Sequence, residues 1–224
     1  MLEFTYNHNM SKNYFFVDGA ALLGDIRRVR GALGLSVTNR LSLCLLASYF
    51  TGHDFYEFHG GSYSRFVFYF VQDDERLRSA VELPDFTRPG TVSDLRIEYC
   101  GKKVKDFEKA REWLEEHSAP NHVKDCLYRS EKAVDTQICC DALQLAATGK
   151  LDRLFLYTND YDFAPLCGAL RQLGANINLF RLRSDAVNAD LVKEFDAFHV
   201  ISDDQLRSCF VTANSADEEP SPLP

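Results

Sequence analysis

Short apolar runs recur along the chain and predict buried strands. Each is rich in aromatic or branched residues and is bounded by glycine or polar residues, the pattern of a strand that is buried on both faces. These runs cover residues 14–17, 65–71, 154–157, 177–180 and 198–201. A further pair of segments, 95–99 and 103–104, surrounds Gly101 and predicts a hairpin.

Between the strands, apolar residues recur at the spacing of a helix. Helices are predicted over residues 20–29, 37–50, 107–117, 133–148, 163–173 and 189–195. Gly149 and Gly174 follow two of these patterns, where glycine commonly ends a helix. The alternation of strands and helices predicts an α/β fold, with a mostly parallel sheet and helices on both of its faces.

The length of 224 residues suits one α/β domain. We expect a loose lead-in over residues 1–12, the domain over residues 13–210, and a tail over residues 211–224. The tail contains three prolines and three acidic residues, a composition that predicts disorder.

Several features favour a cytoplasmic protein with no membrane partner. No apolar run is long enough to span a bilayer, and residues 1–12 lack the apolar stretch of a signal peptide. The seven cysteines form no disulfide framework, and two of them, Cys139 and Cys140, are adjacent in a predicted helix. We therefore expect reduced thiols in a reducing compartment.

The net charge of −8 argues at first against a nucleic-acid partner. Three of these charges belong to the acidic residues of the tail, and five more belong to the candidate site residues described next. The rest of the chain is therefore balanced. A metal that neutralised the five carboxylates would remove their repulsion of a phosphate chain.

Three aspartates follow predicted strands. Asp18 ends the first strand, and Asp160 and Asp162 come just after the strand at 154–157. The carboxyl ends of parallel strands share one edge of a sheet, so these three carboxylates can converge there. Each also has an ordinary structural interpretation, because aspartate is common in turns and at helix N-caps.

Two further aspartates lie in the predicted helix over residues 133–148. Asp135 stands near its start, where N-capping is the ordinary interpretation. Asp141 shares a helix stripe with the apolar residues Ile138 and Leu145. A carboxylate on an apolar stripe needs a partner, so we expect Asp141 to face either the site or a buried partner such as an arginine.

Five such carboxylates suit Mg²⁺ or Mn²⁺, which prefer oxygen ligands and bridge phosphates. The chemistry indicated is transfer of a phosphoryl group to water, with the metal activating the water and stabilising the leaving oxygen.

Three segments together resemble the signature blocks of the NYN domain. They are residues 16–20, residues 132–135 with Asp141, and residues 158–163 with Pro165 and Leu166. The turn at residues 174–177 is also similar. NYN domains, including the LabA-like group, belong to the PIN-domain superfamily of metal-dependent ribonucleases.

This resemblance implies a PIN-like, Rossmann-like fold with an acidic pocket that binds Mg²⁺ or Mn²⁺ and cleaves RNA. By position, Asp18, Asp135, Asp160 and Asp162 match the metal-binding acids, and Asp141 matches a supporting carboxylate. Lys132 matches a basic residue that contacts phosphate. The block at residues 158–163 also contributes Asn159 and Tyr161 as candidate substrate contacts. Two positions differ from the family pattern: Ala21 replaces an asparagine, and Tyr161 replaces a small residue.

Several alternatives stay open. Arg181 and other arginines after predicted elements could line an RNA path or could be ordinary solvated residues. Ala21 favours an inactive module that binds RNA or a protein partner. A second alternative is a phosphatase of the haloacid-dehalogenase type, but that family needs an aspartate at the position of Ala20. Zinc could bind Cys100, His117, His122 and Cys126, although their spacing is not a tight zinc pattern. A homo-oligomer is compatible with the sequence, but nothing in it selects one.

Overall fold

The computed structural model describes residues 12–51, 63–72, 74–84, 94–102, 115–117, 132–183 and 187–212. Most of the predicted lead-in, helix 107–117 and tail therefore lie outside the described residues.

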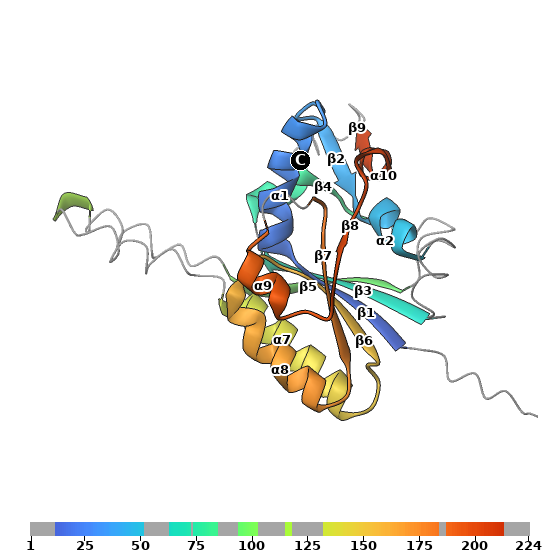
Figure 1. Ribbon diagram of the computed structural model, residues 1–224. Helices are drawn as coiled ribbons and strands as arrows, with labels where there is room; N and C mark the ends of the chain where they lie inside the picture. The colour runs from blue at the N-terminus through green and yellow to red at the C-terminus, as the bar shows by residue number, and fades with distance from the viewer. Residues whose placement is uncertain are drawn as a thin grey trace, which may run out of the picture.

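The core of the fold is a six-stranded sheet in which every pairing is parallel (Figure 1). Its strands are β1 (Lys12–Asp18), β3 (Tyr63–Gln72), β5 (Leu95–Lys102), β6 (Arg153–Tyr157), β7 (Asn176–Arg181) and β8 (Ala197–Val200). The order across the sheet is β5-β3-β1-β6-β7-β8. This is the order of a doubly wound Rossmann sheet, in which the first strand lies at the centre and the direction of winding reverses beside it.

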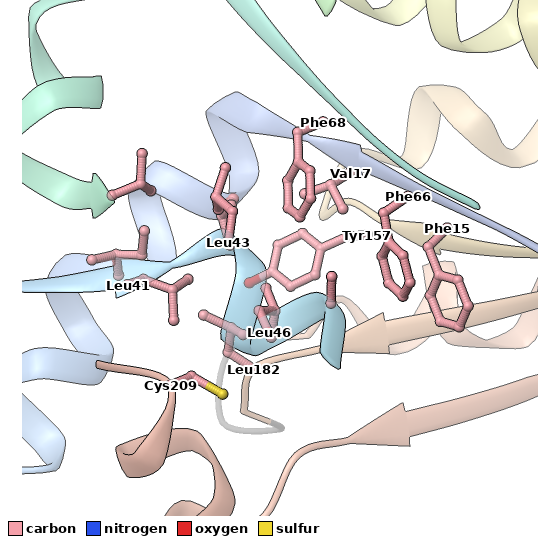
Figure 2. Packing of buried hydrophobic residues seen from close by; sticks show 14 of the residues in the cluster. Phe15, Val17, Leu41, Leu43, Leu46, Phe66, Phe68, Tyr157, Leu182 and Cys209 are labelled. Atoms are coloured by element: carbon pink, nitrogen blue, oxygen red, sulfur yellow. The ribbon is translucent and has the colours of Figure 1, made fainter. Parts of the chain in front are cut away.

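The central strands β1, β3 and β6 carry continuous apolar runs because both faces of the sheet are covered. In β1, Phe15 and Val17 belong to one core and Tyr14 and Phe16 to the other. Successive side chains of a strand point to opposite faces, so a continuous apolar run supplies two cores at once. Figure 2 shows Phe15 and Val17 on the first of these faces, together with Phe66, Phe68 and Tyr157 of the neighbouring strands.

Helices cover the two faces separately (Figure 1). Helices α1 (Gly19–Ala32) and α2 (Leu43–Thr51) contribute to the core that contains Phe15. Helices α7 (Lys132–Ala147) and α8 (Ala164–Gln172) contribute to the core that contains Phe16. The predicted α/β fold, with a parallel sheet and helices on both faces, is confirmed. Within the described part of the chain, no helix combines the length and the apolar character needed to cross a membrane.

A second, three-stranded sheet corrects part of the prediction. It contains β2 (Asn39–Ser42), β4 (Val81–Glu82) and β9 (Phe210–Thr212), in the order β4-β2-β9. The prediction of one helix over residues 37–50 was wrong, because residues 39–42 pair with strands from distant parts of the chain. Strand β9 ends at Thr212, two residues after the domain boundary that was predicted at residue 210.

The predicted hairpin around Gly101 was also wrong. Gly101 lies inside the single strand β5, which pairs in parallel with β3 through a register shift near Val71. The shorter elements are α4 (Glu75–Ala80), α9 (Ala189–Lys193), α10 (Asp203–Ser208) and the 3₁₀ turn η1 (Tyr161–Phe163).

Gly19 begins α1 where the backbone passes close to β3. A Cβ at this position would collide with the carbonyl oxygen of Tyr69 and the ring of Phe70. We therefore expect Gly19→Ala to lower the free energy of unfolding by about 2 kcal/mol through overpacking.

Gly24→Ala is the matched control, because Gly24 lies in the same helix and a Cβ there meets nothing within 4 Å. Alanine at an open helix position raises stability by about 0.5–1 kcal/mol. Urea unfolding of both variants measures the contrast, and equal stability of the two would contradict the close packing of Gly19 against β3.

Candidate acidic site at the carboxyl edge of the sheet

Asp18 ends β1 and is the N-cap of α1. Its Oδ1 accepts hydrogen bonds from the backbone N–H groups of Ala20, at 2.9 Å, and Ala21, at 3.3 Å. The side chain is buried, with the residue 6% exposed. The cap fixes this carboxylate at the carboxyl edge of the central strand.

Thr158 joins Asp18 to the acidic segment that follows β6. Val17 pairs with Tyr157 across the two strands, so the next residues, Asp18 and Thr158, leave the sheet side by side. The Thr158 hydroxyl donates to Asp18 Oδ2 at 3.2 Å and accepts from the Asp160 N–H at 3.1 Å. These two contacts bring Asp18 and Asp160 together at the point where the sheet reverses its winding, which is where α/β sheets bind ligands.

The segment after Thr158 presents polar groups to solvent. Asp160 caps η1 by accepting from the Asp162 N–H at 2.9 Å, and both aspartates are exposed. Tyr161 is 46% exposed, and its hydroxyl lies 3.4 Å from Glu194 Oε1. Asn159 is also exposed and accepts a long contact from the Asn188 N–H at 3.5 Å. These side chains are therefore accessible to a ligand at the sheet edge.

Asp135 reaches the same edge from α7. Gln144, late in α7, lines a pocket together with Tyr14, near the start of β1. Asp141, earlier in α7, bonds to Tyr69, and Tyr69 pairs with Asp18 at the end of β1. The helix therefore runs antiparallel to the strands, and its first turn lies at their carboxyl ends. Asp135, in that turn, is half-buried and lies about 9 Å farther along the helix axis than Asp141. Lys132 is the first residue of α7.

Asp141 has protein partners on the α7 face of the sheet. It accepts from the Tyr69 hydroxyl at 2.9 Å and from Gln137 Nε2 at 2.8 Å. Burial, together with the neighbouring Asp141, raises the pKa of Tyr69, which keeps this hydroxyl protonated. Asp141 lines a pocket of about 270 Å³ whose lining includes none of the other four candidate aspartates. Its buried partner is therefore a tyrosine, and it lies apart from the group around Thr158.

Arg181 lies in the interior and not on a surface path for RNA. Its side chain is 1% exposed and forms an ion pair with Asp25 of α1, whose side chain is 8% exposed. Arg181 Nη1 also donates to the carbonyl oxygen of Thr158 at 2.7 Å, and its guanidinium lies 4.9 Å from the centre of the Tyr157 ring. This placement corrects the expectation that Arg181 contacts a substrate.

Tyr157 and Arg28 complete the surroundings of Asp25. Both donate hydrogen bonds to its carboxylate. Burial raises the pKa of Tyr157, with Asp25 as the next cause, so Tyr157 stays a hydrogen-bond donor. Two other arginines also bond to the protein: Arg30 to backbone carbonyls of α4, and Arg183 to Asp203.

Within the described ranges, no group of three or more histidine, cysteine or acidic side chains could hold a metal ion. Of the four residues considered for zinc, Cys100 is half-buried and His117 is exposed, while His122 and Cys126 lie outside these ranges. Oxygen donors at the edge, from Asp18, Asp160 and Asp162, match hard cations in type. As placed, however, they do not form a complete protein cage.

Helix N-termini add a positive field to this acidic edge. Helix α1 starts at Gly19 and α7 starts at Lys132, and α8 follows η1 directly. The macrodipole of a helix favours an anion at its N-terminus, and at α1 the Asp18 carboxylate already occupies that position. The edge can therefore attract both a cation, through its carboxylates, and a phosphate, through the helix ends.

The sequence profile of the NYN domain matches residues 68–203, which is more than half of the chain. This chain belongs to the NYN domain family. NYN domains are PIN-like and nuclease-like as a family. The match covers α7, β6 and the acidic segment at residues 158–163, and it begins after Asp18. The phosphatase alternative is left without support.

One solved structure that matches this chain is that of a protein of unknown function from Vibrio parahaemolyticus RIMD 2210633. The similarity has a TM-score of 0.44 and 13% sequence identity, and it covers 88% of this chain and 96% of that chain. None of the curated proteins matches this chain.

Sequence reasoning missed Thr158 and Asp25 as organising residues of this NYN domain. Thr158 lies in the segment 158–163 that resembles an NYN signature block, but the sequence predicted no function for its side chain. Asp25 lies three residues after Leu22 and four before Val29, so it shares an apolar helix stripe with them. The argument that singled out Asp141 would therefore have found Asp25 as well.

Proposed function

We propose that this protein is a metal-dependent endoribonuclease that hydrolyses phosphodiester bonds of RNA with Mg²⁺ or Mn²⁺. The observation that carries the proposal is the junction at Thr158, which holds Asp18 and Asp160 together at the switch point of an NYN fold. Asp162 follows two residues after Asp160 and is exposed, which supports a site that a ligand can reach from solvent.

The donor set suits one mode of Mg²⁺ or Mn²⁺ binding, in which few ligands come from the protein. Mg²⁺ is commonly held by one or two carboxylates, with waters and substrate phosphates completing its shell, and does not require an all-protein cage. Bound at this edge, the cation would supply an activated water and would stabilise charge on the scissile phosphate.

Each acidic residue then has a proposed role. Asp18, Asp160 and Asp162 hold the metal, with the buried Asp18 anchored by its cap, Asp160 anchored by its contact with η1, and Asp162 exposed. Asp135, at the start of α7, holds a second metal or orients the attacking water. We give Asp141 a structural role with Tyr69.

The RNA would approach along the exposed side of this edge. Lys132 and the N-terminus of α7 contact a phosphate, and Asn159 contacts the backbone or a base. The half-exposed ring of Tyr161 supplies a face on which a base can stack, a contact worth about 1–3 kcal/mol. Single-stranded or unpaired RNA is the substrate that this arrangement favours, because its bases are free to stack.

One sequence feature favours a second candidate, a catalytically weak NYN module that binds RNA or a protein partner. Ala21 stands where the family pattern has an asparagine, and a methyl group cannot hold a water or metal ligand. Metal affinity separates the two candidates, because the binding module has no need of a divalent cation.

A reducing compartment, the cytoplasm, fits this proposal. The six cysteines within the described ranges are all free thiols. Cys167 is buried, and this burial raises its pKa to about 12, so that thiol stays protonated and unreactive at neutral pH.

The test is cleavage of an internally labelled RNA by wild type and by Asp162→Asn, with Mn²⁺ or Mg²⁺ and with EDTA. We expect the wild type to cut and EDTA to abolish cutting. Asp162→Asn should slow it by about 100-fold or more, because a neutral amide binds a cation less well than a carboxylate.

Asp204→Asn is the matched control, since Asp204 is likewise an exposed aspartate in the first turn of a helix, but it lies in α10. It should cut like the wild type. Equal cutting by all three proteins would identify a contaminating nuclease. A folded wild type that cuts none of a range of RNAs would favour the binding module.

A further inference from the structure

A buried ion pair lies directly behind the acidic edge. Arg181, from the end of β7, and Asp25, from α1, are almost completely enclosed by protein. A buried charge pair adds little stability over apolar residues of the same size, so its presence calls for another explanation. The ion pair is connected to the acidic site, because Arg181 also contacts Thr158, the residue that joins Asp18 to Asp160.

The contacts form one chain from the ion pair to the carboxylates. Arg181 uses one arm of its guanidinium for Asp25 and the other for the carbonyl oxygen of Thr158, at 2.7 Å. The Thr158 hydroxyl then contacts Asp18 Oδ2 at 3.2 Å and the Asp160 N–H at 3.1 Å. The carbonyl of Thr158 is thus fixed by Arg181, and its hydroxyl contacts both Asp18 and Asp160.

The guanidinium is itself held in position. It lies over the ring of Tyr157, with 4.9 Å between its central carbon and the ring centre, and Tyr157 donates its hydroxyl hydrogen to Asp25. Figure 2 shows the Tyr157 ring packed into the core on the α1 face, near Val17 and Leu46. The planar fork of arginine suits this two-armed contact, and a lysine cannot reproduce it.

We propose that Arg181 and Asp25 are positioning residues that act through Thr158 to fix Asp18 and Asp160 relative to each other. They touch neither metal nor RNA. The role of this arrangement in metal binding rests on the nuclease function proposed above. The positioning itself does not, and it can be measured without any cleavage.

The test uses the full chain and four variants. Thr158→Val removes the hydroxyl at nearly constant volume, and Thr158→Ser retains it. Arg181→Lys keeps the charge but loses the fork. Val29→Ala is the control, because Val29 is buried in the same helix as Asp25, one turn farther from Asp18, and should lower stability without touching the chain of contacts. Readouts are hydrogen–deuterium exchange of residues 158–163 and Mn²⁺ affinity by electron paramagnetic resonance.

We expect Thr158→Val and Arg181→Lys to speed exchange in residues 158–163 and to weaken Mn²⁺ binding by about tenfold or more. Thr158→Ser should restore both readouts, and Val29→Ala should change neither. Unchanged exchange in Thr158→Val and Arg181→Lys would overturn the proposal, as would a Val29→Ala protein that behaves like them. If the wild type binds no Mn²⁺ and cuts no RNA, the nuclease function fails, and exchange alone decides the positioning.

Discussion

Asp18→Asn is expected to slow RNA cleavage by about a thousandfold while the protein stays folded. Asparagine caps helices about as well as aspartate, so the amide oxygen can still accept from the N–H groups of Ala20 and Ala21. What the substitution removes is the negative charge at the carboxyl end of β1 and, at the second oxygen, the acceptor of the Thr158 hydroxyl. Cleavage rates at saturating Mn²⁺, measured beside thermal unfolding, separate these two functions of one side chain.

Asp18→Ala provides the comparison. It loses the cap as well as the charge, and we expect it to lower the free energy of unfolding by about 1 kcal/mol in addition to the loss of cleavage. If Asp18→Asn cut RNA at the wild-type rate, Asp18 would be a helix cap and nothing more, and the proposed metal site would have to be rebuilt without it.

Arg181→Met is expected to lower the free energy of unfolding by about 3 kcal/mol, measured by urea denaturation. Methionine fills much of the same space but leaves Asp25 without its buried cation, with Arg28 as an exposed one, and removes the Arg181 donor from the Thr158 carbonyl. Removing one member of a buried ion pair is costly for this reason. Replacing Asp25 by asparagine in the same protein should recover part of the loss, because the buried carboxylate charge that has lost its buried partner is gone.

Arg183→Met is the matched control, two residues farther along the chain. Arg183 also pairs with an aspartate, but its side chain is 27% exposed and that of Asp203 is 59% exposed. Exposed pairs contribute about 0–1 kcal/mol, so this variant should stay close to wild type. Similar losses in both variants would mean that burial does not set the strength of the Arg181–Asp25 pair.

The central strands of the main sheet were predictable from the sequence because they are buried on both faces. A run such as residues 154–157 must be apolar at every position, which makes it easy to recognise. Strand β2 was missed for the opposite reason. It is short and lies in a leucine-rich stretch that also fits a helix, and only pairing with β4 and β9 determines its conformation.

The sequence predicted where the candidate site would lie, but it did not predict the contacts between the side chains around it. Strand-end position alone indicated Asp18 and Asp160, since parallel strands end at a common edge. Asp141 and Arg181 show the limit of that reasoning, because burial against a particular tyrosine or aspartate depends on packing between distant elements. A polar residue on an apolar stripe shows that it has a partner but does not identify the partner.

The central place of β1 affects when the acidic edge can exist during synthesis. Strand β1 is translated first, but its neighbours β3 and β6 come from much later in the chain. A nascent chain on the ribosome therefore carries Asp18 without Asp160 until β6 has left the exit tunnel. Contacts of such long range form late. Asp18 and Asp160 therefore cannot be held together until the whole segment from β1 to β6 has been translated.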